Sequence, residues 1–167
     1  MPASFRFLSL FVVCLFAALP AAFGQEASPQ TEKRLLLFTH FIGTTINSYT
    51  PENAASIPAK VLPFAVGSGK TALREFLQKQ AIYIIREGIK SSYLPTASSF
   101  SAIVHDGATP TYTTLIRGKR TATLIFEGKE MQTDDLLEVE MDVAPYKQTK
   151  ENPFGLVLTA YRENVLE

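Results

Sequence analysis

The chain is nearly free of cysteine. Its single cysteine, Cys14, lies in the apolar amino-terminal segment, so residues 25–167 contain no thiol. Neither a disulfide nor a thiol nucleophile is therefore available in that part of the chain. Small secreted eukaryotic domains usually depend on disulfides, so an exported chain without them favours a bacterial protein.

An excess of basic charge is also missing. The sequence has 16 Lys and Arg against 16 Asp and Glu, and without residues 1–24, which hold Arg6 and no acid, the count becomes 15 against 16. Proteins that bind a phosphate backbone carry clustered positive charge. Nucleic acid is therefore not an expected partner.

No apolar run is long enough to cross a bilayer, which takes about 20 residues. The longest, Phe7–Leu19, is broken by Ser9, follows Arg6 and precedes the small-x-small pattern Ala22-Phe23-Gly24. This arrangement is typical of a secretory signal peptide. We expect a cleaved signal peptide over 1–24, a flexible leader over 25–33 and a single domain over 34–167, in a secreted or periplasmic protein without a membrane span.

The first half of the domain is expected to contain one strand and one principal helix. Aromatic and β-forming residues predict a strand over Arg34–Ile42, apolar on both faces. Three prolines within 44–66 predict a long connection, either a loop or one that holds a short strand at 60–66. Apolar residues at helical spacing then predict a helix over Thr71–Glu87 that ends at Gly88.

The second half is expected to be β. Strands are predicted over 98–105, 111–117, 121–127, 136–143 and 155–162, with Gly118-Lys119 as a type II′ hairpin turn. In the fourth of these, Leu137, Val139, Met141 and Val143 alternate with the outward Glu138, Glu140 and Asp142.

The predicted fold class is α+β. A mainly antiparallel sheet of about five to six strands packs against one principal helix, in the order β-loop-α-β-β-β-β-β. That order resembles the cystatin-like and NTF2-like architectures in outline, without a sequence motif of either family.

The segment Gly67-Ser68-Gly69-Lys70-Thr71 resembles the end of a phosphate-binding loop. Such a loop needs a further glycine five residues before Gly69, where this chain has Phe64. No parallel sheet with alternating helices is expected to accompany it. We interpret the segment as a glycine-rich entry to the helix that can form an anion-binding nest, and we expect no nucleotide and no other cofactor.

The two histidines are the weak catalytic candidates. His40 and His105 lie on predicted strands, and Asp106 follows His105, but neighbouring strand residues point to opposite faces. No further ligand stands at metal-binding spacing, so no metal site is predicted. Ile82 and Tyr83 lie outside the main apolar stripe of the helix, which predicts either cover by residues 91–99 or a partner surface.

Three functions remain open. The leading hypothesis is an exported, non-catalytic domain that binds a protein or a small apolar ligand. The first alternative is a small hydrolase or isomerase with a polar cleft formed by His40, His105 and an acid such as Asp106 or Asp142. The second alternative is a structural component of an envelope assembly, which the strand predicted to be apolar on both faces would permit.

The glycine segment gives a first prediction. Lys70→Ala should leave the fold and the function nearly intact, with the melting temperature within about 2 °C of wild type, because a helix entry does not need this ammonium group. Thermal unfolding and anion titration measure the two effects. A large loss of binding of a specific anion in this variant would show that the loop is a ligand site.

Overall fold

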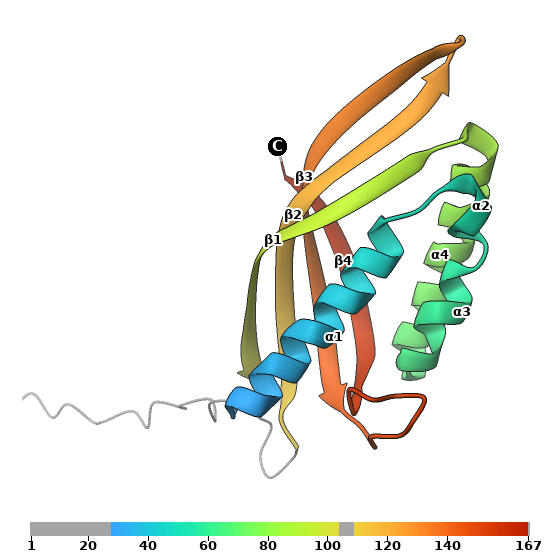
Figure 1. Ribbon diagram of the computed structural model, residues 1–167. Coiled ribbons are helices and arrows are strands. Elements are labelled where there is room, and N and C mark those ends of the chain that lie inside the picture. Colours follow the sequence, from blue (N-terminus) through green and yellow to red (C-terminus); the bar gives the residue numbers. More distant parts are fainter. Residues whose placement is uncertain (1–27, 104–108, 167) are drawn as a thin grey trace, which may run out of the picture.

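The computed structural model describes residues 28–103 and 109–166, and in it all helices precede all strands (Figure 1). The helical part comprises α1 (Pro29–Asn47), α2 (Pro51–Ala54), α3 (Ile57–Val61), the 3-10 helix η1 (Leu62–Phe64) and α4 (Gly67–Glu87). The strands are β1 (Lys90–Ile103), β2 (Thr111–Phe126), β3 (Lys129–Pro145) and β4 (Leu156–Leu166). The α+β class is confirmed.

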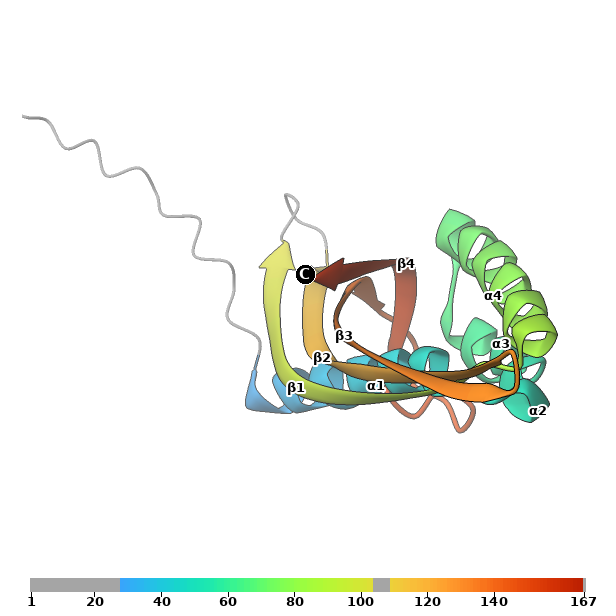
Figure 2. The ribbon, with the colours of Figure 1, turned by 90° about the horizontal axis from the view of Figure 1, so that it is seen from above.

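The strands form one antiparallel sheet in chain order, β1-β2-β3-β4. Seen from above, the sheet bends along its length and α4 stands beside β4 (Figure 2). Four strands and two long helices replace the predicted five to six strands and single principal helix. Within the described residues, no helix combines the length and the apolar character that crossing a membrane requires.

The predicted hairpin at Gly118-Lys119 is wrong, because β2 continues straight through it. Gly118 is paired with Pro95 on one side and Leu137 on the other. A Cβ at this position would overlap the Leu94 carbonyl and lie 2.8 Å from the Tyr93 ring. This glycine therefore permits close packing of β1 on β2, and the actual turn is at Glu127-Gly128, where both residues have positive φ.

The predicted strand over 34–42 and the leader over 25–33 are also wrong where the structure describes them, since residues 29–47 form α1. The Ser28 hydroxyl caps the helix by accepting from the Thr31 N–H, and Pro29 occupies its first turn. Leu35, Phe38 and Ile42 are fully buried at helical spacing. The apolar run is dense enough to imitate a strand with two buried faces.

The long connection over 44–66 is mostly helical. Pro51, Pro58 and Pro63 each stand in the first turn of a short helix, where a missing N–H costs nothing. Residues 60–64 lie in α3 and η1, so the alternative of a short strand there is wrong. The predicted helix is confirmed as α4 and ends at Gly88 in the left-handed conformation.

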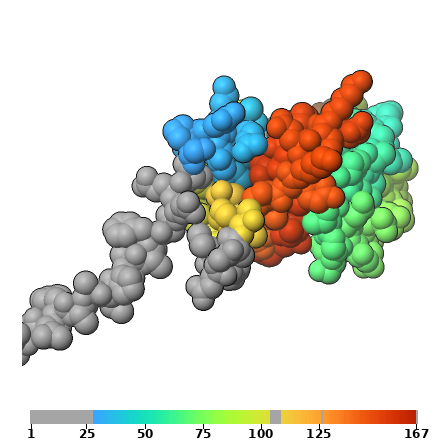
Figure 3. Space-filling view, turned by 90° about the horizontal axis from the view of Figure 1, so that it is seen from below, coloured from blue at the N-terminus to red at the C-terminus, as the bar shows by residue number. Residues whose placement is uncertain are grey.

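The core lies between α1 and the sheet, and an aromatic cluster closes one end of it. Phe38, Phe41, Phe64 and Phe154 form this cluster, with ring centroids 5.4–6.1 Å apart. Phe64, which stands where a phosphate-binding loop needs glycine, is thus a core residue. Figure 3 shows this end of the molecule, where α1, the connection between β3 and β4, and α3 with the first turns of α4 lie side by side.

The first turn of α4 lies directly against the backbone of β4. A Cβ on Gly69 would overlap the carbonyl group of Thr159, so only glycine fits at this position. Val66, the residue before α4, donates its N–H to the Leu158 carbonyl at 3.1 Å and so holds the first turn of the helix on β4.

The contact predicts a large effect of one methyl group. Gly69→Ala should lower the free energy of unfolding by about 3 kcal/mol, because the overlap forces α4 away from β4. Urea unfolding measures the change, with the exposed neighbour substitution Ser68→Ala as the control, expected within about 0.5 kcal/mol of wild type. Equal stability of the two variants would contradict the close approach.

Candidate functional site

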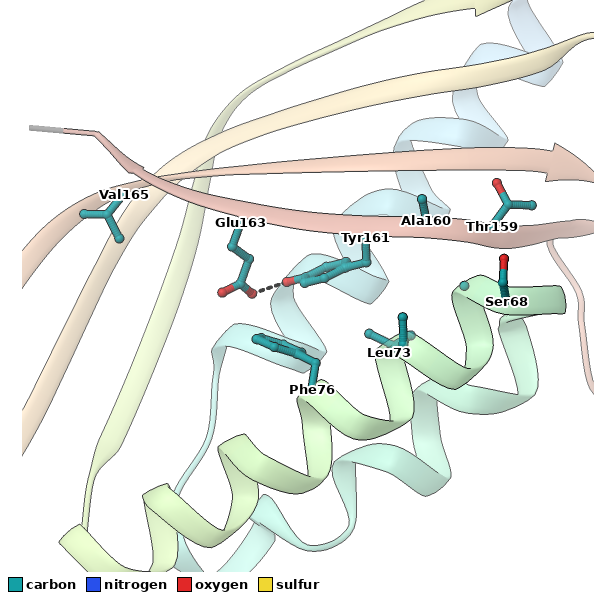
Figure 4. Close-up of a pocket in the computed structure, with 10 residues that line it drawn as sticks. Ser68, Leu73, Phe76, Thr159, Ala160, Tyr161, Glu163 and Val165 are labelled. Carbon is teal, nitrogen blue, oxygen red and sulfur yellow. Dashed lines mark hydrogen bonds between the residues drawn. The ribbon is translucent and has the colours of Figure 1, made fainter.

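A cleft of about 690 Å³ separates α4 from β4 (Figure 4). We call it the α4–β4 cleft. The residues that line it are Ser68, Gly69, Ala72, Leu73, Phe76, Thr159, Ala160, Tyr161, Glu163 and Val165. Its volume lies in the range of about 300–1,000 Å³ that is usual for ligand sites.

The cleft arises from the way in which α4 meets the sheet. The helix and β4 are close at Ser68 and Thr159 and diverge toward Phe76 and Val165 (Figure 4). Since β4 is the edge strand, its outer side faces the helix. Across residues 28–103 and 109–166, the only pairing on that side is an isolated bridge between Leu158 and Ala65. Beyond the bridge, the edge strand leaves backbone N–H and C=O groups available.

A chain of polar side chains runs through the wall of the cleft. Tyr161 donates its hydroxyl hydrogen to Glu163 Oε1 and accepts a hydrogen bond from Asn47 Nδ2 at 2.9 Å. Asn47 is fully buried at the end of α1 and also donates to the Gly43 carbonyl at 3.2 Å. The carboxylate of β4 is thereby fixed through α1.

Apart from the hydroxyl residues Ser68 and Thr159, apolar and aromatic groups form the rest of the wall. The Phe76 ring on α4 lies 5.9 Å from the Tyr161 ring on β4, centroid to centroid. Leu73 projects from α4 toward the strand, and Val165 marks the wide end (Figure 4). One carboxylate therefore stands in largely apolar surroundings.

The tyrosines near this carboxylate resist ionisation. Burial, and next the charge of Glu163, raises the pKa of Tyr93 to about 12. The same two causes raise the pKa of Tyr161 well above its ordinary value. Burial also raises the pKa of Tyr49. All three phenols are therefore neutral hydrogen-bonding groups at physiological pH.

Glu163 has no basic partner in the described part of the chain. The arginine beside it in sequence, Arg162, points to the opposite face of the sheet and bonds Glu140 at 2.8 Å and Asp142 at 2.7 Å. Glu138 is held by Arg117 at 2.7 Å on that same face. The outward acidic row is thus neutralised by arginines, as expected for a solvated face, whereas the inward carboxylate is not.

The glycine segment contributes two residues to this site. Ser68 and Gly69 line the closed end of the cleft, and Gly67, Lys70 and Thr71 complete the first turn of α4. Neither Ser68 nor Thr71 caps the helix, whose N-cap residue is Val66. The anion nest remains a prediction, and the segment's evident role is the close approach to β4.

The weak catalytic candidates are only partly described. His40 lies on α1 rather than on a strand, half-buried beside a shallow groove on the outer side of that helix. His105 and Asp106 lie outside the described residues. Asp142 is held by Arg162 and Thr113. Residues 28–103 and 109–166 contain no group of three His, Asp or Glu arranged to hold a metal ion.

Ile82 and Tyr83 are uncovered. Their side chains are 66% and 53% exposed, and residues 91–99 lie in β1 instead of over α4. Of the two explanations given for these residues, cover by that segment is wrong. Their role as a partner surface remains a prediction.

Sequence reasoning missed the polar chain of Asn47, Tyr161 and Glu163. The predicted connection over 44–66 includes Asn47, and the predicted last strand ends at Arg162, so the sequence assigns Glu163 to neither face of the sheet. The signal was present in the alternation of Tyr161, Glu163 and Val165, which puts an acid on the same side as two apolar residues.

The buried tyrosines predict a loss of stability in alkali. An unfolded tyrosine releases its proton near pH 10, whereas folded Tyr93 keeps it until about pH 12. The stability that the protonated Tyr93 phenol contributes to the folded state is therefore complete below pH 10 and is lost as the pH rises through 12. We expect Tyr93→Phe to flatten this fall in denaturant titrations, and the exposed substitution Tyr146→Phe to leave it unchanged. An unaltered slope in Tyr93→Phe would contradict the assignment.

No protein-family model and no curated protein sequence matches the chain. Solved structures do share its fold. The VirB8 protein of Agrobacterium tumefaciens superimposes with a TM-score of 0.61 at 20% identity, over 85% of this chain and 97% of that one. The periplasmic domain of DotI gives 0.58 at 14% identity, over 78% and 92%.

CagV of Helicobacter pylori, described as a VirB8 homolog of the type IV secretion system, gives a TM-score of 0.62 at 9% identity, over 81% of this chain and 99% of that one. At these identities the likeness concerns the fold. The resemblance to NTF2-like architectures is borne out in this form, with the helices placed before a four-stranded sheet. The chain therefore has the VirB8-like, NTF2-like fold.

Proposed function

We propose that this chain is a non-catalytic domain of a protein assembly in the bacterial periplasm, of the type IV secretion kind. The observation that carries the proposal is the shared fold, which extends over 97% of VirB8, 92% of the DotI periplasmic domain and 99% of CagV. A signal peptide over residues 1–24 would deliver the domain to that compartment.

The surface of α4 supports a role in binding proteins. Ile82, Tyr83 and Ile85 are each at least half exposed on one stretch of this helix. A neighbouring groove runs between α4 and the short helices, with Pro58 and Leu62 among its lining residues. Clustered apolar side chains on the surface of a soluble domain mark an interaction site more often than isolated ones do.

The α4–β4 cleft supports the same role. Its tyrosine, Tyr161, stays protonated, and its carboxylate, Glu163, is hydrogen-bonded and fixed in place. Such a wall suits recognition of a partner group, because it offers a preformed carboxylate beside aromatic rings. We therefore assign binding to this site rather than catalysis, and envelope assembly rather than capture of a small apolar ligand.

Size fractionation of the native cell envelope tests the proposal. After extraction in mild detergent, the wild-type protein should run in particles much larger than one chain. Ile82→Glu should shift at least about half of it to the free fraction, because a charge on a buried contact costs several-fold in affinity. The purified variant should keep the wild-type melting temperature, because Ile82 is exposed in the isolated domain.

Ile125→Glu is the matched control, since Ile125 is 70% exposed and lies on β2 near the β2–β3 turn rather than on α4. It should leave the particles intact. A wild-type protein found only as a free domain in the envelope extract would contradict the proposed assembly role. Equal effects of the two variants would contradict the assignment of the surface to α4.

A further inference from the structure

The unpaired carboxylate of the α4–β4 cleft identifies the chemistry of a ligand. Glu163 Oε1 accepts the Tyr161 hydroxyl, and Oε2 has no hydrogen-bond partner among the described residues. A carboxylate beside apolar groups loses hydration, and a positive charge on the ligand would offset that loss. No lysine or arginine of the described residues forms an ion pair with Glu163, so the site favours a cationic ligand.

The neighbouring rings strengthen this preference. Phe76 and Tyr161 approach each other to 5.9 Å next to the carboxylate (Figure 4). The electron-rich face of an aromatic ring attracts a cation, and a guanidinium can stack on a ring while it bonds a carboxylate. Leu73 and Val165 provide apolar contact for the methylene stem of a long basic side chain.

The edge strand identifies the form of the ligand. Beyond Leu158, the described part of the chain places no strand on the outer side of β4. An extended peptide can pair with such an edge, while its alternate side chains enter pockets beside the strand. In the cleft, these side chains would face Phe76 and Glu163.

We propose that the α4–β4 cleft binds an extended segment of a partner protein that lies along β4 and places a basic side chain, arginine above all, on Glu163 beside the rings of Phe76 and Tyr161. This inference rests on the proposed function for the existence of a partner protein. It specifies that the partner contributes an extended segment with a basic side chain. The Gly69 contact fixes the closed end of the cleft, so the basic residue enters from the wide end near Val165.

Titration of the purified, isotope-labelled protein with the peptide acetyl-Val-Arg-Val-amide tests the proposal. The backbone amide signals of residues 68–76 and 159–165 should shift and saturate. The same peptide with citrulline, a neutral isostere of arginine, should bind at least about fivefold more weakly, because it lacks the charge that pairs with Glu163. This comparison uses only the wild-type protein and does not depend on how any variant folds.

Variants locate the interaction. Glu163→Gln keeps an oxygen for the Tyr161 hydroxyl and should weaken arginine-peptide binding at least about fivefold, while citrulline-peptide binding stays unchanged. Glu140→Gln removes a carboxylate from the opposite face of the same sheet and should leave binding unchanged. Phe76→Leu keeps an apolar side chain and should weaken binding about threefold through loss of the ring.

Several results would overturn the proposal. These are equal binding of the arginine and citrulline peptides, shifts confined to another surface, or no saturation up to about 10 mM peptide. Methylguanidinium that binds as tightly as the peptide would refute the extended segment. A failed titration together with large envelope particles would refute this inference alone, whereas free protein in the envelope would refute the proposed assembly role.

Discussion

The direct contact between the first turn of α4 and the backbone of β4 determines the shape of the functional surface. Residue 69 has no side chain, so the helix can rest on the Thr159 carbonyl, and any larger residue would overlap it. From this fixed point the helix and the strand diverge, and the space between them becomes the α4–β4 cleft. The segment Gly67–Thr71, which resembles the end of a phosphate-binding loop, therefore serves as the contact that holds α4 against β4.

The same arrangement determines which side chains meet in the cleft. Because side chains alternate along β4, Arg162 lies on the solvated face of the sheet, where it neutralises Glu140 and Asp142. Tyr161 and Glu163 lie on the other face and line the cleft beside α4. Burial and the charge of Glu163 keep the Tyr161 phenol neutral, because both raise its pKa. A hydrogen bond from the Asn47 amide to the Tyr161 hydroxyl connects Tyr161 and Glu163 to α1. Helix and sheet thus hold one carboxylate ready for a cation that the described chain does not provide.

The sequence predicted the α+β class, α4 with its Gly88 end, and the inward and outward alternation around Met141. Each of these features depends on the spacing of apolar and polar residues that are close together in the sequence, and tertiary contacts do not change it. It did not predict α1, because a dense apolar run imitates a strand, although Ser28 and Pro29 signalled a helix start. It placed a turn at Gly118, where tertiary packing of β1 demands glycine. The cleft joins residues about 90 positions apart, and no local pattern reveals such a contact.

Site-specific photo-crosslinking in living cells tests most directly whether the α4–β4 cleft is the partner-binding surface. A photoreactive residue replaces Ala72, which lines the cleft, or Leu37, which is 54% exposed on α1. We expect an adduct from position 72 whose attached partner peptide contains a basic residue in an extended segment, and little adduct from position 37. Adducts from position 37 alone, or none at position 72 while the protein resides in its assembly, would contradict it.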